Sequence, residues 1–239
     1  MFVSIVIPAK NEETNIERLL TQLSEQSFKD FEVIVADAFS TDRTREIAKS
    51  LSAVIVDGGL PGAGRNLGAA VAKGDIFLFM DADAILRSDH FLQDTLSEMR
   101  HKQLDLAAID VRPSDGNQLD RLTYRFYNAY THLLGKHLPH AVGTCMFAKR
   151  FVHEAIGGFD ETVTLAEDMH YARLGSDVGE FGILRSHSVY TPMRRWRKEG
   201  RVRLTIKYFL SEVFMILRGP IRKPAIYDFE YKQDSPPRP

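Results

Sequence analysis

The chain has 239 residues, of which 44% are hydrophobic and 26% charged, and its 31 Lys and Arg nearly balance its 32 Asp and Glu. This globular composition is sufficient for one large core, and the balanced charge excludes a chain that coats nucleic acid along its whole length. The single cysteine, Cys145, excludes an internal disulfide and a cysteine-based zinc site and favours a reducing compartment.

The first half alternates short β-branched runs with segments of helical period. The expected strands are Val3–Ile7, Phe31–Ala36, Ala53–Val56 and Ile76–Met80. The expected helices cover the apolar stripe Ile16, Leu19, Leu20 and Leu23, the segment from the turn Ser40-Thr-Asp42 to about Leu51, and Asn66–Ala72 after a glycine-rich turn at Gly58–Gly64. Continuous apolar strands separated by helices indicate an α/β doubly wound sheet, mostly parallel and covered on both faces.

The second half is less regular. Strands are expected at Leu106–Val111, Thr144–Ala148 and Ser188–Thr191, and helices at Asp89–Met99, Leu119–Leu134 and Glu167–Leu174. The Tyr and Phe side chains of the Leu119–Leu134 helix are expected in the core. We expect one domain over 1–203, an amphipathic helical extension over 204–228 and a polar tail over 229–239.

No run of about 18 uninterrupted apolar residues, the length of a membrane span, occurs in the sequence. The N-terminus meets a charge at Lys10 and has neither the basic start nor the apolar length of a signal peptide. These features predict a cytoplasmic protein, with peripheral contact at the inner face of the cell membrane left open.

Acidic residues follow three of the expected strands, within Pro8-Ala-Lys-Asn-Glu-Glu13, at Asp37 and in Asp81-Ala-Asp83. Ligands of open α/β sheets bind beyond the carboxyl ends of the strands, and converging acids need a cation or a hydrogen-bonding ligand. Asp81 and Asp83 share one face of extended backbone and can hold Mg²⁺ or Mn²⁺ with positions left for diphosphate oxygens. The alternative is a solvated loop that caps the following helix.

The glycine-rich loop from Gly58 to Gly68 contains Arg65 at the start of an expected helix. Glycines allow close backbone approach, and an arginine beside a helix N-terminus suits phosphate. The spacing matches neither Gly-x-Gly-x-x-Gly nor a P-loop. A phosphate-binding loop and an ordinary turn therefore both stay open.

A further pair of acids, Glu167-Asp168, begins an expected helix. A carboxylate there can serve as a general base if burial or a like-charged neighbour raises its pKa. Helix capping is the alternative, because Thr164 and Glu167 match a capping box. His187 could complete a metal site with the paired aspartates, or be a packed residue.

Taken in order, six motifs resemble glycosyltransferase family 2 over roughly residues 1–200. They are Ser4-Ile-Val-Ile-Pro-Ala-Lys-Asn-Glu-Glu13, Glu32-Val-Ile-Val-Ala-Asp37 with Ser40-Thr-Asp42, Gly64-Arg-Asn-x-Gly68, Asp81-Ala-Asp83, Gly157-Gly-Phe-Asp-Glu161 and Glu167-Asp168. The resemblance implies the GT-A fold and transfer of a sugar from a nucleotide diphosphate sugar, usually with inversion at the anomeric carbon. A UDP- or GDP-sugar and Mn²⁺ or Mg²⁺ are the expected donor and cofactor.

The resemblance also implies roles for single residues. These are Pro8, Ala9 and Glu12 lining the nucleotide pocket, Asp37 on the base, Arg65 near base and diphosphate, Asp81 near ribose and metal, Asp83 on the metal and Asp168 as catalytic base. Arg194, Arg195 and Glu167 are candidates for contact with the diphosphate or the acceptor.

Two segments bear on the kind of transferase. Asp37-Ala-Phe-Ser40 stands where the family commonly has Asp-Asp-Gly-Ser, so the donor nucleotide is left open. Tyr190-Thr-Pro-Met-Arg-Arg-Trp-Arg197 resembles the Arg-Arg-Trp stretch of small, non-processive members. Two rival functions are a sugar nucleotidyltransferase, whose usual loop after the first strand is missing, and a non-catalytic sugar-nucleotide-binding protein.

The near-neutral charge hides a polarised chain. Arg185 to Lys223 holds eleven Lys and Arg against two Glu, which leaves 20 basic against 30 acidic residues elsewhere. The basic run leads into an apolar cluster of helical spacing from Tyr208 to Leu217 that is too short to span a bilayer. We expect this segment to lie on an anionic membrane beside a lipid-linked acceptor, or to pack on the core or in a homodimer interface.

Overall fold

The computed structural model describes residues 1–135 and 137–222. The predicted polar tail, 229–239, and the end of the predicted extension, 223–228, lie outside the described residues. Among the helices of the described ranges, none combines the length and the apolar character needed to cross a bilayer.

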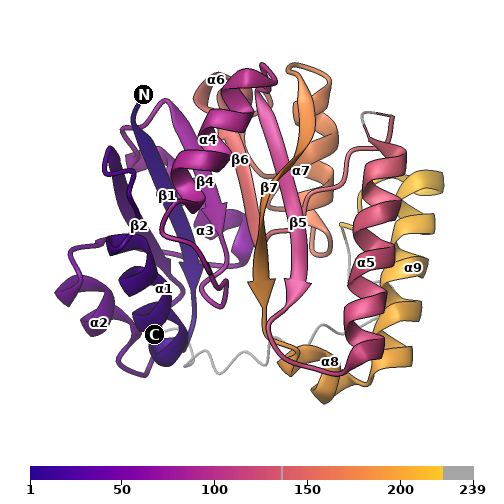
Figure 1. Cartoon of the computed structure of the whole chain (residues 1–239), viewed down its shortest axis with the longest axis horizontal. Helices are drawn as coiled ribbons and strands as arrows, with labels where there is room; N and C mark the ends of the chain where they lie inside the picture. Colours follow the sequence, from indigo (N-terminus) through magenta and orange to yellow (C-terminus); the bar gives the residue numbers. More distant parts are fainter. Residues whose placement is uncertain (136, 223–239) are drawn as a thin grey trace.

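A seven-stranded sheet forms the centre of the molecule (Figure 1). Its strands are β1 (Val3–Ala9), β2 (Phe31–Asp37), β3 (Val54–Asp57), β4 (Ile76–Met80), β5 (Leu106–Pro113), β6 (Cys145–Lys149) and β7 (Phe181–Thr191). Their order is β3-β2-β1-β4-β6-β5-β7, with β6 antiparallel to both of its neighbours and the other pairs parallel. The predicted mixed, mostly parallel sheet is confirmed.

Helices cover both faces of this sheet. They are α1 (Glu13–Ser24), α2 (Thr44–Ser50), α3 (Pro61–Val71), α4 (Phe91–His101), α5 (Gln118–Leu134), α6 (Arg150–Ala155), α7 (Glu167–Ser176), α8 (Arg194–Glu199) and α9 (Arg201–Arg218). In Figure 1, α1 and α4 lie in front of the sheet and α3 and α7 behind it, while α5 and α9 stand side by side at the right-hand end. The helix expected within the extension over 204–228 is α9, which begins at Arg201 and directly follows α8.

The core has two apolar layers because strand side chains alternate between the faces of the sheet. In β1, Val3, Ile5 and Ile7 pack in the layer that includes α1 and α4, whereas Val6 packs in the layer with α3 and α7. All four are fully buried. Runs of apolar residues without polar alternation, which the sequence shows in β1 and β4, are explained by this burial on both faces.

The prediction of a glycine-rich turn up to Gly64 was wrong. Helix α3 already begins at Pro61, a position where the missing N–H of proline costs no helical hydrogen bond. Its glycines permit close packing on the sheet: a Cβ at Gly68 would lie 2.4 Å from Cγ1 of Val6, and one at Gly64 would lie 3.3 Å from Cβ of Pro8. The glycines bring the helix that carries Arg65 close to the sheet.

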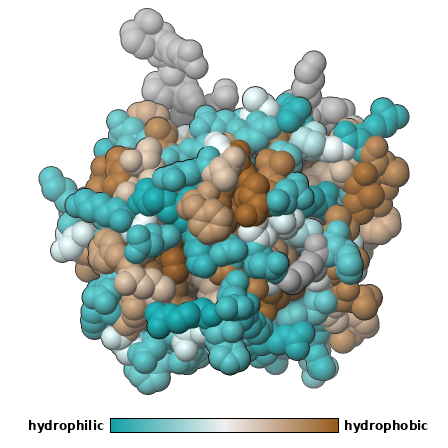
Figure 2. Space-filling view, turned by 90° about the horizontal axis from the view of Figure 1, so that it is seen from above, coloured by the Kyte–Doolittle hydropathy of each residue, from teal (hydrophilic) through white to brown (hydrophobic). Residues whose placement is uncertain are grey.

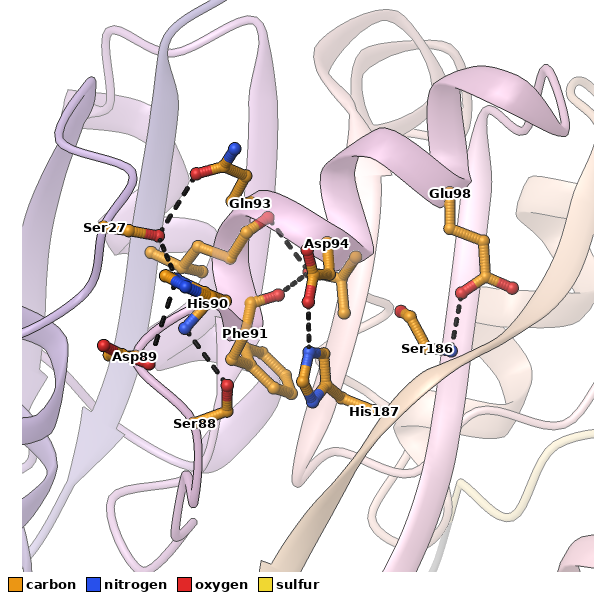
Figure 3. A network of polar contacts seen from close by, with 12 residues as sticks. Ser27, Ser88, Asp89, His90, Phe91, Gln93, Asp94, Glu98, Ser186 and His187 are labelled. Carbon is orange, nitrogen blue, oxygen red and sulfur yellow. Dashed lines mark hydrogen bonds and ion pairs between the residues drawn. The ribbon is translucent and has the colours of Figure 1, made fainter.

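Strand β7 is longer than predicted, and it is hydrogen-bonded to a side chain of α4 (Figure 3). The carboxylate of Glu98 accepts the backbone N–H groups of Arg185 and Ser186 at 2.8 to 3.0 Å and lies 2.6 Å from Nζ of Lys102. The register of β7 against β5 shifts at this point. Glu98 thus supplies acceptors for N–H groups that an irregular ladder leaves without strand partners.

Candidate active site

The loops after β1, β2 and β4 meet at the carboxyl edge of the sheet. Pro8 and Ala9 end β1, and the N–H of Ala38 donates to the carbonyl of Ala9 over 2.8 Å. Arg194 in α8 contacts the carboxylate of Glu12, and its Nη2 lies 3.0 Å from Oδ2 of Asp83. The acids that follow separate strands are therefore held together by one guanidinium.

Arg65 is the centre of a second group of charges. It is 2% exposed, and its Nη2 and Nη1 lie 2.8 Å from Oδ1 of Asp81 and from Oε1 of Glu167. Its guanidinium also lies 5.3 Å from the centre of the Phe159 ring. Although burial opposes it, the charges of the surrounding carboxylates raise the pKa of Arg65, so it stays cationic. Sequence reasoning placed Arg65 beside the donor, whereas here it binds the site's own acids.

Asp168 is held by backbone N–H groups. Its Oδ2 accepts the N–H of Gly143 at 2.6 Å, and its Oδ1 accepts that of Met169 at 2.8 Å. Gly143 also leaves space for Arg65, because a Cβ there would lie 2.4 Å from Nη2 of Arg65. Sequence reasoning missed Gly143, whose only signal was its position just before a strand of the buried sheet.

The environment of these carboxylates disfavours their charged forms. Burial, then the negative charge of Glu167, raises the pKa of Asp168 above its ordinary value. Burial and the charge of Asp81 raise the pKa of Asp83 to about 6, against the opposing effect of Arg194. Burial likewise raises the pKa of Asp81, whose side chain is 36% exposed. A carboxylate poised in this way suits proton transfer near neutral pH.

The alternative of a capping box formed by Thr164 and Glu167 is wrong, although Glu167 and Asp168 both lie in the first turn of α7. Ala166 occupies the N-cap of α7 in a left-handed conformation with φ of 57°, and no side chain caps the helix. Thr164 instead donates to the carbonyl of Ile221, and Glu167 pairs with Arg65. The side chain of Glu167, in the first turn of α7, therefore points toward Arg65 and the site.

Asp37 is buried, and its carboxylate is bound by neighbouring residues of the same loop and of α2. Its carboxylate accepts bonds from the N–H and hydroxyl of Ser40, and Nη1 of Arg45 lies 3.2 Å away. These bonds shape the loop in which Phe39 adopts a φ of 56° and is 69% exposed. Phe39 therefore lies at the surface, and Asp37 stabilises the loop that contains Phe39.

The structure separates the two candidate arginines of α8. Arg194 reaches Glu12 and Asp83, whereas Nε of Arg195 lies 2.8 Å from Oε1 of Glu199, with its guanidinium 5.7 Å from the centre of the Tyr208 ring. Of the two arginines, Arg194 is thus the one with ion pairs to Glu12 and Asp83, and the contact of either with a diphosphate or acceptor stays a prediction.

His187 does not join the paired aspartates. Its Nε2 lies 2.8 Å from Oδ2 of Asp94 on α4, beside the ring of Phe91 (Figure 3). Within residues 1–135 and 137–222, no group of three or more His, Cys, Asp or Glu is placed to hold a metal ion. The prediction that His187 joins Asp81 and Asp83 is therefore wrong, because the bulged strand β7 turns His187 toward α4.

On α5, the expectation of core packing is confirmed for Tyr124, which packs against the apolar core, whereas Phe126 and Tyr130 are exposed. Burial, with a smaller contribution from the charge of Asp83, raises the pKa of Tyr124 to about 12. Burial raises the pKa values of Tyr127 and Tyr208, with smaller contributions from the charge of Asp168 to Tyr127 and from the charges of Glu199 and Asp168 to Tyr208. Trp196 lies between, with ring centres 6.2 Å from Tyr124 and 6.1 Å from Tyr208. Tyr124, Trp196 and Tyr208 thus form an aromatic cluster that joins α5, α8 and α9.

Comparisons of the sequence with known proteins agree with this arrangement. The family model described as Glycosyl transferase family 2 matches residues 4–157, more than half of the chain. Glycosyltransferase AglE of Haloferax volcanii is 28% identical over 262 residues, which cover 95% of this chain and 83% of that protein. The 4,4'-diaponeurosporenoate glycosyltransferase of Staphylococcus haemolyticus is 37% identical over 110 residues, covering 42% of this chain and 29% of that protein.

Solved structures share the fold. S. aureus TarS 1-349 in complex with UDP-GlcNAc matches with a TM-score of 0.67 at 22% identity, covering 81% of this chain and 59% of that one. Mannosyltransferase PcManGT from Pyrobaculum calidifontis, in complex with GDP-Man and Mn²⁺, matches with a TM-score of 0.68 at 23% identity, covering 87% and 64%. This chain spans less than two thirds of either structure's length. The likeness confirms the predicted GT-A fold.

Proposed function

Because the chain belongs to glycosyltransferase family 2, we propose that it transfers a sugar from a UDP- or GDP-sugar to an acceptor hydroxyl or phosphate, with a divalent cation and with inversion. The observation that carries this proposal is the group of carboxylates, Asp81, Glu167 and Asp168, around the buried Arg65. Family membership favours transfer over both rival functions, the nucleotidyltransferase and the non-catalytic binding protein.

Asp81 and Asp83 are the proposed metal ligands. They are two oxygen donors on one loop, and the charge of Asp81 disfavours the charged form of Asp83, which a hard cation would relieve. Two protein ligands leave coordination positions for diphosphate oxygens. When bound, Mn²⁺ or Mg²⁺ would neutralise charge that develops on the leaving diphosphate. The complex of PcManGT with GDP-Man and Mn²⁺ supports this role.

Asp168 is the proposed catalytic base. Its raised pKa suits a carboxylate that takes the proton of an acceptor hydroxyl, while its bonds from Gly143 and Met169 fix its direction. The acceptor oxygen then attacks the anomeric carbon from the face opposite the diphosphate, the bond from that carbon to the phosphate oxygen breaks, and the proton remains on Asp168. Attack from the opposite face inverts the anomeric configuration.

The remaining site residues bind the donor in this proposal. Pro8, Ala9 and Glu12 border the nucleotide at the end of β1, and Asp37 holds the loop that presents Phe39 to the base. Arg194 is the cation placed to reach the diphosphate, since it already contacts two acids of the site. The UDP-GlcNAc and GDP-Man of the two matching structures make both nucleotides reasonable donors to test.

The proposed acceptor is lipid-linked. Tyr124, Tyr208 and Trp196 form an aromatic cluster between α8, which carries Arg194, and the apolar helix surfaces of α5 and α9, and this suits a molecule with a polar reacting group and an apolar remainder. The name of the diaponeurosporenoate glycosyltransferase is compatible with an acceptor of this kind.

Assays of donor binding and of turnover distinguish the proposed metal-ligand role of Asp83 from the proposed base role of Asp168. We expect UDP- or GDP-sugars with Mn²⁺ to raise the thermal midpoint of the wild type, because a ligand at about 100 times its Kd stabilises by about 2.7 kcal/mol. Asp83→Asn should lose this shift. Asp168→Asn should keep it but lose release of the nucleotide diphosphate by about a hundredfold or more.

Asp89→Asn is the matched control, since Asp89 is a largely exposed acid outside the site. It should behave as the wild type in both assays. Metal-dependent donor binding that survives Asp83→Asn would overturn the metal assignment. Equal loss of donor affinity and turnover in Asp168→Asn would overturn the role of base.

A further inference from the structure

The solvent-facing sides of α5 and α9 are apolar. On α5 the exposed apolar side chains follow helical spacing and are Leu119, Leu122, Phe126, Tyr130 and Leu133. On α9 they are Val202, Ile206, Phe209, Leu210, Ile216 and Leu217. Figure 2 shows hydrophobic surface at the right-hand edge of the molecule, where Figure 1 places these helices. We call this surface, defined by those eleven residues, the outer α5–α9 face.

The outer α5–α9 face is not the back of a core helix. α9 packs on the protein through Leu204, Lys207, Ser211 and Met215, which lie on its opposite side. Phe209 and Leu217 remain 67% and 74% exposed. A contiguous apolar surface of this kind marks an interaction site on a soluble domain.

A groove joins the stripes of the two helices. It has a volume of about 230 Å³, with Leu119 of α5 and Val202 and Ile206 of α9 among its lining residues. Tyr124 and Trp196 line it too, and Trp196 belongs to the short helix α8 that carries Arg194 to Asp83. The groove therefore lies between the outer α5–α9 face and the helix that carries Arg194.

The unpaired charges of the two helices are all positive. Arg121, Arg125, Arg203 and Arg218 are exposed and make no ion pair within the residues that the structure describes. The acids of α5 and α9 are both engaged: Asp120 by Arg201, and Glu212 by His140 and Tyr130. The apolar surface is thus accompanied by free arginines without competing carboxylates.

We propose that the outer α5–α9 face docks the protein on an anionic lipid bilayer. Apolar side chains of such a face enter the boundary between headgroups and acyl chains, while the arginines meet anionic headgroups. A second copy of this chain fits less well, because the like-charged arginines would be brought together. The inference rests on the proposed function in one respect: docking would bring a lipid-linked acceptor to the end of the groove.

Vesicle sedimentation of the full chain tests this proposal. We expect binding to phosphatidylcholine vesicles that contain phosphatidylglycerol, weaker binding as NaCl rises, and much less binding to pure phosphatidylcholine. Phe209→Ser should lower the partition coefficient about tenfold or more, which is the loss expected when one phenylalanine no longer enters an apolar medium. Arg203→Glu with Arg218→Glu should lower it on anionic vesicles.

Two matched controls keep the test specific. Phe151→Ser makes the same change at an exposed phenylalanine of α6, and Lys49→Glu reverses an exposed charge of α2. Both should bind vesicles as the wild type does. Equal loss in the controls, or no vesicle binding by the wild type, would overturn the proposal. A doubled mass in light scattering that Phe209→Ser abolishes would assign the face to a second copy instead.

The wild type and Phe209→Ser also allow the docking surface and the proposed function to be tested independently. Phe209→Ser should retain the thermal shift with a UDP- or GDP-sugar and Mn²⁺, because Phe209 lies outside the donor site. Donor binding without vesicle binding would refute the docking surface alone. Vesicle binding without any donor shift would refute the proposed function alone.

Discussion

Gly143→Ala offers a sharp test of how the carboxylate site is held. The added Cβ would lie 2.4 Å from Nη2 of Arg65 and 3.4 Å from Oδ2 of Asp168. A normal carbon–nitrogen contact needs about 1 Å more, and the buried guanidinium can give way only by lengthening its 2.8 Å contact with Asp81. One hydrogen bond between charged groups contributes about 1.5–3 kcal/mol, so we expect a loss of that order.

For a chain of this size that loss lowers the thermal midpoint by roughly 3–12 °C. Urea unfolding and thermal melts measure it, and release of the nucleotide diphosphate should fall with it because Asp81 and Asp168 both shift. Gly59→Ala is the control, since a Cβ there would meet only Cβ of Ala63 at an ordinary 3.5 Å. If Gly143→Ala were as stable and as active as Gly59→Ala, Arg65 would not be confined as described.

Three more predictions follow from named contacts. Glu167→Gln should lower the pKa of Asp168, because it removes a negative neighbour; turnover, which is lost as falling pH protonates Asp168, should then persist to lower pH in a pH profile of kcat/KM. An unchanged profile would exclude Asp168 as the titrating base. Against the opposing effect of burial, bonds from Lys102 and from the N–H groups of Ser186 and Arg185 lower the pKa of Glu98 to about 2. The Glu98 carboxylate therefore stabilises the folded protein fully above about pH 4.5, and this contribution is lost as pH falls toward 2. Glu98→Gln should lower the free energy of unfolding by about 2–3 kcal/mol at pH 7 and by little at pH 2, as measured by urea unfolding. A cost independent of pH would contradict this. Phe39→Gly should relieve a left-handed φ and leave stability unchanged or up to about 1 kcal/mol higher, yet weaken donor binding in calorimetry; undiminished affinity would remove Phe39 from the donor site.

Several features were predictable because they depend on neighbours in the sequence. Continuous apolar runs that alternate with segments of 3.6-residue period indicated the α/β class, and acids directly after β4 marked the edge where the loops meet. The pair Glu167-Asp168 was also visible, but its two readings, capping and base, could not be separated. That choice depended on whether Glu167 turned back to its own helix or outward to Arg65.

Tertiary structure alone decided the contacts between distant parts of the chain. Arg65 lies 78 residues from Gly143 and 102 from Glu167, so no local pattern could show that it is buried among carboxylates. The distinction between Arg194 and Arg195, the pairing of His187 with Asp94, and the solvent-facing apolar side of α9 likewise depend on which elements pack together. Periodicity indicates that a helix has two unlike sides, and only packing determines which side meets the protein and which is left for a partner.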